Sequence, residues 1–533
     1  EQKCKLKHVN TINRGDYGWQ IVVDQQKCTN IEEVDNYYYR IGSFLSVFLL
    51  LGTDDLHNEN IISCGEYPYF IDLETLVKTE QGTSIFSGVM KTFFDEINHS
   101  VLSTMLLPTN AIYSAMDCDI GGISSFNEEA TTRMKAFQLI KKGTDKIALE
   151  QREVFMGSGD NHLYLNDNVV YPNNFSEEIV NGFKDTFHIL IKNMDAVKSI
   201  INSRTIFSRC VVRPTFVYGS FLDASLHPNY LQDIKKRNKL FAHLYTTKEA
   251  NNTMLVSQEV EALMNGDIPY FHQVGRNLIC NQGTVIPYYF AHPLEETISN
   301  RIEIMKRANL DRQISYIRLS LSTLKNRTSI EKVNMFKELS FTSRARELVQ
   351  FNNESIIKEL ESKMFNKLLW DADHKSCTWI SATQLEKQYS LNCANASIYE
   401  SGGVLMFYLM LYKQTSDEKY LLYAESIFRG LEEMGILKQK LNESAFIGIS
   451  SHLYLAANLY QLTKKAEYKN FVINCLHQLE EIEFSNLDYL NGVSGLLVLL
   501  NNLQKKIPLN ETLSLTNKAI RYMDKHIDQF QPE

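Results

Sequence analysis

The sequence predicts an α+β protein built in two parts. Up to about residue 345, strand-like and helix-like stretches are mixed, whereas residues 346–533 read as helices almost throughout. The length of the chain is a further observation, because 533 residues are enough for more than one domain. We therefore predict two domains, 1–345 and 346–533, the first mixed and the second helical.

The elements of the first part can be placed in order. The run Asn36–Leu51 has the apolar content and the length of a buried helix, and Gly52 is a natural stop for it. GEYPYFIDLE, which follows, predicts a turn at Gly65–Pro68 and then a short strand. CVVRPTFVYG, residues 210–219, has a strand-like composition. A helical pattern then covers Thr297–Leu324.

The second part contains a weak internal repeat. ESGGVLMFYLMLY, AFIGISSHLYLAANLY and LNGVSGLLVLLNNL each place a glycine just before an apolar helix, and Gly403, Gly448 and Gly492 are about 45 residues apart. This period is typical of stacked helical hairpins. Residues 515–530 begin another unit that is not completed, and three repeats do not close a toroid, so we expect a C-terminal part to be missing.

Composition argues against several classes of protein. A formal net charge of −8 does not suit a nucleic-acid binder or a membrane-surface protein. Nine cysteines are scattered without a CxxC pair, which favours reduced thiols of the cytoplasm over a disulfide framework. The longest apolar run is too short to cross a bilayer, and no signal peptide precedes it. We expect a cytoplasmic protein without a transmembrane segment.

The segment from Gly52 to Leu76 has the residues that phosphoryl transfer needs. Asp55, His57 and Asn60 form a D-x-H-x-x-N cluster, and Asp72 and Glu74 follow in IDLE. A carboxylate must accept the proton of the attacking hydroxyl, and oxygen ligands must hold magnesium on the phosphates. The spacing resembles the catalytic and metal-binding loops of lipid kinases. The alternative interpretation is a polar loop of ordinary turn residues.

Those residue types predict separate roles. Asp55 is the predicted base, and His57 would stabilise charge on the transferring phosphoryl group. Asn60 and Asp72 are the predicted magnesium ligands, with Glu74 as a further metal or orienting group. A short hairpin between the two clusters would fold one back over the other.

A second cluster of polar residues flanks the strand-like run. If this run is extended, residues 209, 211, 213 and 215 share one face, so that Arg209, Arg213 and Thr215 could converge on one phosphate. The alternative is a structural salt bridge and a strand threonine. His227–Pro228 and Asp267–Pro269 are interpreted as structural turns.

Residues 1 to about 345 resemble the dehydratase domain of the class II lanthipeptide synthetases, the LanM family. The similarity rests on residues 37–76 and on SVLSTMLLP, R-x-x-x-R-P-T, SLHPNYL and NGDIPYF, which occur in the family's order. CTWISA, IYESGGVLMF and LDYLNGVSGLL resemble the first half of its LanC-like cyclase domain. The resemblance implies a lipid-kinase-like catalytic core with helical elaborations, followed by part of an α/α toroid.

The family's activity is then what the resemblance implies for this chain. The dehydratase uses ATP and Mg²⁺ to phosphorylate Ser and Thr of a precursor peptide, then eliminates phosphate to leave dehydroalanine or dehydrobutyrine. Residues at the positions of Arg209 and Thr215 serve the elimination. The substrate would be a leader followed by a core with Ser, Thr and Cys, and an export transporter is a further candidate partner. The nucleotide-binding lysine is expected upstream of Glu1.

The cyclase of the family adds Cys thiols to these alkenes with a zinc ion held by two Cys and one His. No Cys-His dipeptide occurs here, and the last cysteine, Cys475, lies too early to match. We therefore predict no zinc ligands in this chain and expect Zn²⁺ only in a missing C-terminal part. Asp488 matches an acidic residue near the cyclase site, with a helix N-cap as the alternative. Ser451 stands where glycine is usual, and the IYESGG segment is one residue tight.

Two other functions stay open at this point. One is a kinase-like phosphotransferase that stops at the phosphopeptide. The other is a non-catalytic peptide-binding scaffold, against which the intact set of Asp55, His57, Asn60 and Asp72 argues.

Overall fold

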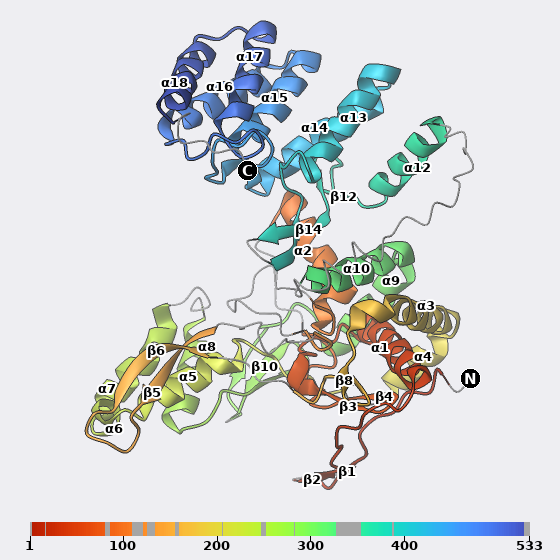
Figure 1. Ribbon diagram of the computed structural model, residues 1–533. Coiled ribbons are helices and arrows are strands. Elements are labelled where there is room, and N and C mark those ends of the chain that lie inside the picture. The colour runs from red at the N-terminus through yellow and green to blue at the C-terminus, as the bar shows by residue number, and fades with distance from the viewer. Residues whose placement is uncertain are drawn as a thin grey trace. The chain divides into compact units, whose positions relative to one another are not determined.

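The computed structural model describes most of the chain. The described residues are 3–15, 17–79, 86–108, 121–124, 134–154, 159–204, 206–246, 252–281, 283–326, 353–385 and 388–526. The chain divides into two compact units (Figure 1). The first consists of Glu1–Thr83, Ile97–Arg344 and Ala382–Leu391, and the second of Ser84–Glu96, Ala345–Ser381 and Asn392–Glu533. The domain boundary predicted near residue 345 lies outside the described residues.

The first unit combines helices with small antiparallel sheets, as an α+β fold should. Its longer helices are α1 (Ile31–Leu51), α3 (Ser176–Lys192), α4 (Met194–Asn202), α5 (Thr215–Ser225), α7 (Ile234–Phe241), α8 (Thr253–Met264), α9 (Leu294–Arg307) and α10 (Leu310–Ser322), with a single turn, α6 (Pro228–Leu231). Hairpins are formed by β1–β2 (Thr11–Asn13, Gly18–Gln20), β3–β4 (Ile61–Cys64, Tyr67–Phe70), β5–β6 (Met134–Ile140, Ala148–Val154) and β7–β8 (Tyr164–Leu165, Asn168–Val169). A three-stranded sheet contains β9 (Phe271–Val274), β10 (Asn277–Cys280) and β11 (Val285–Ile286).

Helix α1 is the centre of this unit. The helix predicted for 36–51 is confirmed, but it begins earlier, where the Asn30 side chain accepts a hydrogen bond from the backbone N–H of Glu33. Gly52 ends it in a left-handed conformation with a φ of 69°. Thirteen residues of α1 are buried, including Tyr37, Ile41 and Leu45, which explains why the helix reads as continuously apolar.

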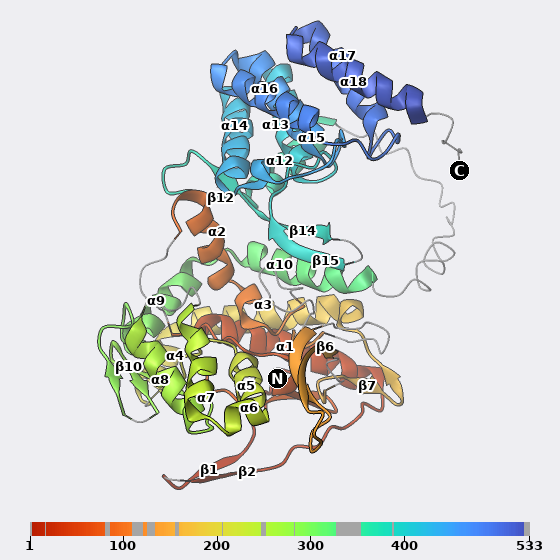
Figure 2. The same cartoon turned by 90° about the vertical axis from the view of Figure 1, so that its left-hand side faces the viewer.

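Two glycines let α1 and α3 cross in close contact, and the two helices run side by side in Figures 1 and 2. A Cβ on Gly42 would lie 1.9 Å from the carbonyl oxygen of Ile179, and one on Gly182 would lie 1.8 Å from that of Tyr39. Neither position can carry a side chain unless the helix backbones move apart. The pair of glycines therefore sets the separation of α1 and α3.

A buried arginine fixes the next hairpin on α1. Arg40, whose side chain is 2% exposed, donates a hydrogen bond from Nη1 to the Glu66 carboxylate at 3.0 Å, and its guanidinium stacks over the Tyr67 ring at 4.0 Å. The Tyr37 and Ser63 hydroxyls lie 2.7 Å apart. The turn and strand predicted for GEYPYFIDLE are thus present as the β3–β4 hairpin, held against the helix that precedes it.

Two predicted elements differ from the structure. The helix predicted for 297–324 is two helices, α9 and α10, because Ala308 is extended and the Asn309 side chain caps a new helix by accepting the N–H of Arg312. The strand predicted for 210–219 is wrong, because residues 210–214 belong to no strand and α5 begins at Thr215 directly after Pro214. Proline suits the start of a helix, where its missing N–H costs no hydrogen bond.

The second unit is almost wholly helical. It contains α2 (Gly88–Asn98) for most of its length, α12 (Asn353–Phe365), α13 (Ser401–Thr415), α14 (Glu418–Glu433), α15 (Ile449–Thr463), α16 (Ala466–Glu481), α17 (Val493–Lys506) and α18 (Asn510–His526). Short strands β12 (Leu369–Trp370) and β13 (Cys377–Thr378) pair before the helices. The hairpin of β14 (Ile380–Leu385) and β15 (Gln388–Cys393) belongs to the first unit for most of its length. Helices α13 to α18 form three antiparallel hairpins within the described residues, as the repeat predicts. The last predicted helix, 515–530, is α18, and residues after 526 lie outside the description.

The repeat is set by asparagine turns as well as by glycines. The side chains of Asn395, Asn442 and Asn486 each accept the backbone N–H two residues later, at 3.0, 3.2 and 2.8 Å. Gly448 and Gly492 are then the N-caps of α15 and α17, six residues after their asparagines. In the first repeat the N-cap is Glu400, five residues after Asn395. This segment is therefore one residue shorter than in the other two repeats, as the spacing of IYESGG indicates.

No helix in the described part of the chain combines the length and apolarity needed to cross a bilayer.

We expect Gly182→Ala to destabilise the first unit by about 1–3 kcal/mol, because the new methyl group overlaps the α1 backbone. Gly219→Ala is the matched control, since Gly219 lies within α5 and a Cβ there has no neighbour within 4 Å. That change should be neutral or should stabilise by about 0.5–1 kcal/mol. Urea denaturation followed by circular dichroism measures both. Equal effects would contradict the close crossing.

Candidate functional site

Two threonine side chains tie together the loops that hold the predicted catalytic residues. The Thr53 hydroxyl donates a hydrogen bond to the carbonyl of Leu76 at 2.7 Å, and the Thr75 hydroxyl donates one to the carbonyl of Asp54 at 2.8 Å. Both threonines are buried. The loop after α1 and the loop after β4 are therefore fixed to each other, and the hairpin does fold one cluster back over the other.

Asp55 and Asp72 share an uncommon backbone conformation. Their φ angles are 63° and 55°, in the left-handed region that aspartate visits more readily than most residues but still seldom. Such conformations persist only where the surrounding structure imposes them, and they concentrate at functional sites. The two carboxylates predicted to carry the chemistry are both held in this way.

His57 and Asn60 are fixed by the same loop. His57 Nδ1 accepts the N–H of Glu59 at 3.3 Å, so its other nitrogen, Nε2, faces the Asp55 carboxylate at 3.9 Å. This contact is too long for a hydrogen bond but is close enough for a charge interaction. Asn60 is buried and donates from Nδ2 to the carbonyl of Asp55 at 2.8 Å. The amide nitrogen is occupied in this way, and Oδ1 is the atom suited to a metal ion.

The surroundings of Asp55 shift its pKa upward. Burial is the largest cause, the neighbouring Asp54 and Asp72 carboxylates add to it, and His57 and Arg209 act in the opposite direction. The side chain is still 45% exposed, so solvent screens part of these interactions. A raised pKa is favourable in a general base, because a more basic carboxylate takes a proton more readily.

Arg209 reaches this group from a distant part of the chain. Its backbone N–H donates to the carbonyl of Glu74 at 2.9 Å, and its Nη1 forms an ion pair with the Glu74 carboxylate. The neighbouring Ser208 hydroxyl donates to the carbonyl of Val77, and Cys210 N–H donates to that of Phe271. The segment 208–210 thus lies between the loop after β4 and strand β9.

Tyr270 is a residue of this site that the sequence did not single out. It lies just before β9, and the Arg209 guanidinium stands 5.1 Å from the centre of its ring. Burial raises the pKa of Tyr270, the Glu74 and Asp72 carboxylates raise it further, and Arg209 lowers it. Tyr270 belongs to the motif NGDIPYF, from which the sequence predicted only a structural turn at Asp267–Pro269.

Arg213 is not in the same place as Arg209. It forms a two-point ion pair with Glu259 on α8, through Nε at 2.7 Å and Nη2 at 3.2 Å, and the Tyr218 hydroxyl donates to the same carboxylate at 2.6 Å. Arg213 and Glu259 are both buried. Because the chain turns into α5 at Thr215, the alternating face predicted for 209–215 does not exist. Thr215 is exposed at the first position of that helix.

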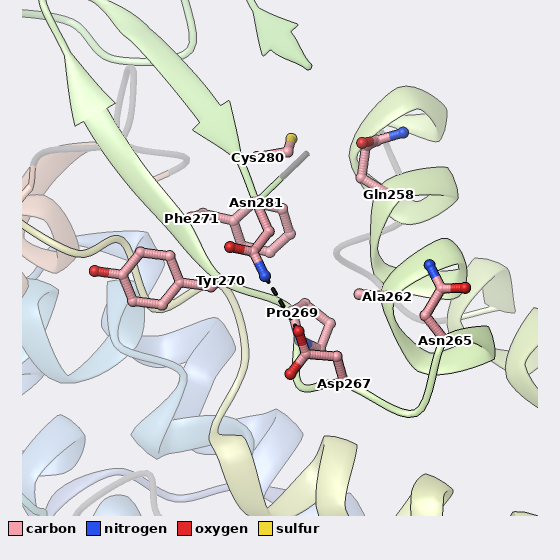
Figure 3. A pocket seen from close by; sticks show the side chains of 9 residues that line it. All are labelled: Gln258, Ala262, Asn265, Asp267, Pro269, Tyr270, Phe271, Cys280 and Asn281. Carbon is pink, nitrogen blue, oxygen red and sulfur yellow. Dashed lines mark hydrogen bonds between the residues drawn. The ribbon is translucent and has the colours of Figure 1, made fainter. Parts of the chain in front are cut away.

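A small pocket lies on the other side of Tyr270, between α8 and the β9–β10 strands (Figure 3). Its volume is about 40 Å³, enough for water but far too small for a nucleotide. The side chains of Asp267 and Asn281 are hydrogen-bonded at 3.2 Å on its wall. Asp267 thus has a structural partner, which suits its interpretation as a turn residue.

The donor set of the loops suits magnesium. Asp72 supplies an exposed carboxylate and Asn60 an amide oxygen, while Glu74 is engaged by Arg209. Within the described residues, no three His, Cys, Asp or Glu side chains gather closely enough to hold a metal ion by themselves. Magnesium in such sites takes one or two carboxylates and completes its shell with phosphate oxygens and water, so the residues present fit it.

The second unit does not assemble a zinc site from its described residues. Among the described residues, no three His, Cys, Asp or Glu side chains lie close enough together to hold a metal ion, and Cys393 and Cys475 are both buried. Asp488 accepts the N–H groups of Leu490 and Asn491 at 2.8 and 2.6 Å through one oxygen, in the turn before α17. The N-cap of that helix is Gly492, so the N-cap alternative for Asp488 is wrong.

The setting of Arg213 predicts a structural role. Arg213→Ala leaves the buried Glu259 carboxylate without this partner and should cost about 3–5 kcal/mol of stability. Replacing both residues, as Arg213→Met with Glu259→Leu, should recover most of that loss. Thermal unfolding measures both variants. If the double variant is no more stable than Arg213→Ala, the loss does not come from the unpaired carboxylate.

Comparison with known proteins finds similarity in two regions of the chain. A family model described as "Domain of unknown function (DUF4135)" matches residues 1–273, and one described as "Lanthionine synthetase C-like protein" matches residues 394–532. The chain is also 24% identical, over 536 residues, to the lacticin 481/lactococcin biosynthesis protein LcnDR2 of Lactococcus lactis subsp. lactis. That match covers 96% of this chain but only 56% of the relative.

The first model covers more than half of the 533 residues, and the second begins after it in the order that the sequence resemblance implied. The chain therefore belongs to the DUF4135 family and, with a lanthionine synthetase C-like region behind that domain, is a chain of the LanM type.

Proposed function

We propose that this chain works in lanthipeptide synthesis in the cytoplasm. In this proposal the first unit uses ATP and Mg²⁺ to phosphorylate Ser and Thr of a precursor peptide and then eliminates the phosphate. The products are dehydroalanine and dehydrobutyrine, to which the cyclase of the whole protein adds Cys to form (methyl)lanthionine. The observation that carries the proposal is the pair of left-handed carboxylates, Asp55 and Asp72, on two loops tied together by hydrogen bonds.

In the phosphorylation step, Asp55 accepts the proton of the substrate hydroxyl. Its raised pKa suits this role, and the nearby His57 Nε2 stabilises the negative charge on the transferring group. Asn60 and Asp72 would hold magnesium, which, when bound, neutralises charge on the ATP phosphates. The surrounding structure imposes the left-handed backbone conformation on both aspartates. It therefore keeps their carboxylates in place before substrate arrives.

In the elimination step, a base takes the α-proton of the phosphorylated residue, the C–H electrons form the C=C bond as the C–O bond to phosphate breaks, and Arg209 is the group that stabilises the departing phosphate. Its guanidinium is a permanent cation whose donors match phosphate oxygens in pairs. Thr215, exposed at the start of α5, is proposed to assist the elimination because the family resemblance implies it, and its hydroxyl is a hydrogen-bond donor. A phosphotransferase without elimination is the alternative, and phosphate retained on the product would favour it.

The helical unit contributes only part of a cyclase in this proposal. Asp488 is its candidate residue, and the described cysteines do not fit a zinc site, so no step is assigned to zinc here. A precursor peptide is the proposed partner, with a leader and a core containing Ser, Thr and Cys, and an export transporter remains a proposed second partner.

Substitutions of the two left-handed aspartates should stop the first step in different ways. In the full-length enzyme, Asp72→Ala should abolish phosphorylation, since a charged ligand is lost where phosphates must be neutralised. Asp55→Asn should leave the fold and the nucleotide affinity intact and lower turnover by orders of magnitude, because an amide cannot take the proton. Mass spectrometry of candidate precursors with ATP follows the reaction.

The control for these variants is Asp167→Ala. Asp167 is 91% exposed and forms a surface ion pair with Lys27, so turnover should be unchanged. A fall of less than about tenfold in Asp55→Asn would show that Asp55 is not the base.

Substitutions of Arg209 and Thr215 should separate the two steps. Arg209→Ala or Thr215→Ala should slow elimination by about 10²–10³-fold, while phosphorylation continues. The product is then a peptide that is heavier by phosphate instead of lighter by water. Unmodified peptide would place the residue in the first step or in the fold. Dehydration at the normal rate would show that the substituted residue has no role in the elimination.

A further inference from the structure

Arg209 has two kinds of partner, and they use different parts of its side chain. The Glu74 carboxylate takes an N–H donor at Nη1, whereas the Tyr270 ring lies under the guanidinium with 5.1 Å between the Cζ atom and the ring centre. A guanidinium has five N–H donors in its plane and none perpendicular to it. A ring below the cation attracts it through the negative face of the π system and occupies no donor.

This difference matters for the elimination step. To hold a phosphate, Arg209 must turn donors toward the phosphate oxygens, and Glu74 competes for at least one of them. An anion near the Glu74 carboxylate is also repelled by it. The contact with Tyr270 can persist throughout, because it does not depend on the donors. Of the two partners, the ring is therefore the one able to hold the cation while its hydrogen bonds change.

The ring of Tyr270 is itself held in place. Phe207 lies nearly parallel to it, at 12° with 6.5 Å between centroids, and His272 lies 6.3 Å away. Phe207 and His272 also contact each other at 4.9 Å. The backbones of Arg209 and His272 form an antiparallel bridge. Figure 3 shows the Tyr270 ring turned away from the Asp267–Asn281 pair and from α8, so it does not fill the small pocket.

We propose that Tyr270 is a positioning residue for phosphate elimination, whose ring keeps the Arg209 guanidinium in the site while its N–H donors pass from Glu74 to the phosphate. This inference rests on the proposed function of Arg209. Its consequence is that Tyr270 acts through its aromatic face, so the hydroxyl is dispensable and the π electrons are not.

Binding of inorganic phosphate to the whole chain, measured by isothermal titration calorimetry, tests this without requiring turnover. Tyr270→Leu should weaken phosphate binding on the order of tenfold, and Tyr270→Phe should change it by no more than about twofold. Glu74→Gln should tighten it by up to about fivefold, the value of a partly exposed ion pair. Arg209→Ala should remove most of the affinity.

A fluorinated series separates the ring's electrostatics from its shape. Phenylalanine with one, three and four ring fluorines at position 270 keeps the size of the side chain but depletes the negative face, so the phosphate Kd should rise stepwise. These variants keep the packing of Phe207 and His272, and they answer the question even if Tyr270→Leu fails to fold. Tyr288→Leu is the matched control, since Arg276 lies over Tyr288 at 5.5 Å in the same unit. It should leave phosphate binding unchanged.

The outcomes distinguish failure of the role proposed for Tyr270 from failure of the role proposed for Arg209. If Arg209→Ala weakens phosphate binding but the fluorinated series leaves it flat, Tyr270 does not position Arg209 and the proposed function stands. If Arg209→Ala has no effect, or if the unmodified chain does not bind phosphate, the role of Arg209 in elimination fails and this inference fails with it. A stepwise loss across the series, with Tyr270→Phe near the unmodified chain, supports both.

Discussion

The close crossing of α1 and α3 is the constraint on which the first unit depends. Two helix backbones can come into contact only where neither helix has a side chain between them. Gly42 on α1 and Gly182 on α3 meet this requirement. The position of α1 then sets the point at which the loop after its C-terminus begins. Gly52 turns the backbone out of the helix, and the predicted catalytic loop follows at once. Arg40 fixes the β3–β4 hairpin to the same helix, so the second loop is placed by the same element as the first.

The site built on this support concentrates negative charge. Asp54, Asp55, Asp72 and Glu74 lie on two loops that Thr53 and Thr75 hold together, and like charges at short range repel. Two cations of the described residues offset part of this charge through ion pairs, Lys78 on Asp54 at 3.3 Å and Arg209 on Glu74. The remaining excess is what a divalent cation would neutralise. The local charge balance and the left-handed backbone at Asp55 and Asp72 both suit the proposed site, which would bind a cation and an anionic group.

Local sequence patterns predicted the helix and the hairpin that carry the candidate site, whereas its long-range contacts could not be predicted from them. The α1 helix, the β3–β4 hairpin and the two acidic clusters are specified within fifty residues, by apolar content, glycine stops and motif spacing. Arg209 could be named from its resemblance, but its pairing with Glu74 depends on backbone hydrogen bonds across 135 residues. Arg213 and Thr215 were grouped with it on the assumption of an extended chain, and Pro214 instead begins a helix. The helical repeats were predicted from glycine spacing. The asparagine turns that set their register are harder to predict, because the segment after the first turn is one residue shorter than the others.

The ion pair between Glu74 and Arg209 gives the proposed two-step reaction a physical order. While Glu74 holds Arg209, the guanidinium is partly neutralised and has fewer donors for an incoming anion. A phosphate that arrives on the peptide would compete with the Glu74 carboxylate for those donors. In this proposal the phosphoryl group is transferred beside the carboxylates of Asp55 and Asp72. It is then released beside Arg209, the cation that pairs with Glu74. On this view one site can serve both half-reactions because a single carboxylate exchanges partners between them, and Tyr270 keeps the cation within reach during the exchange.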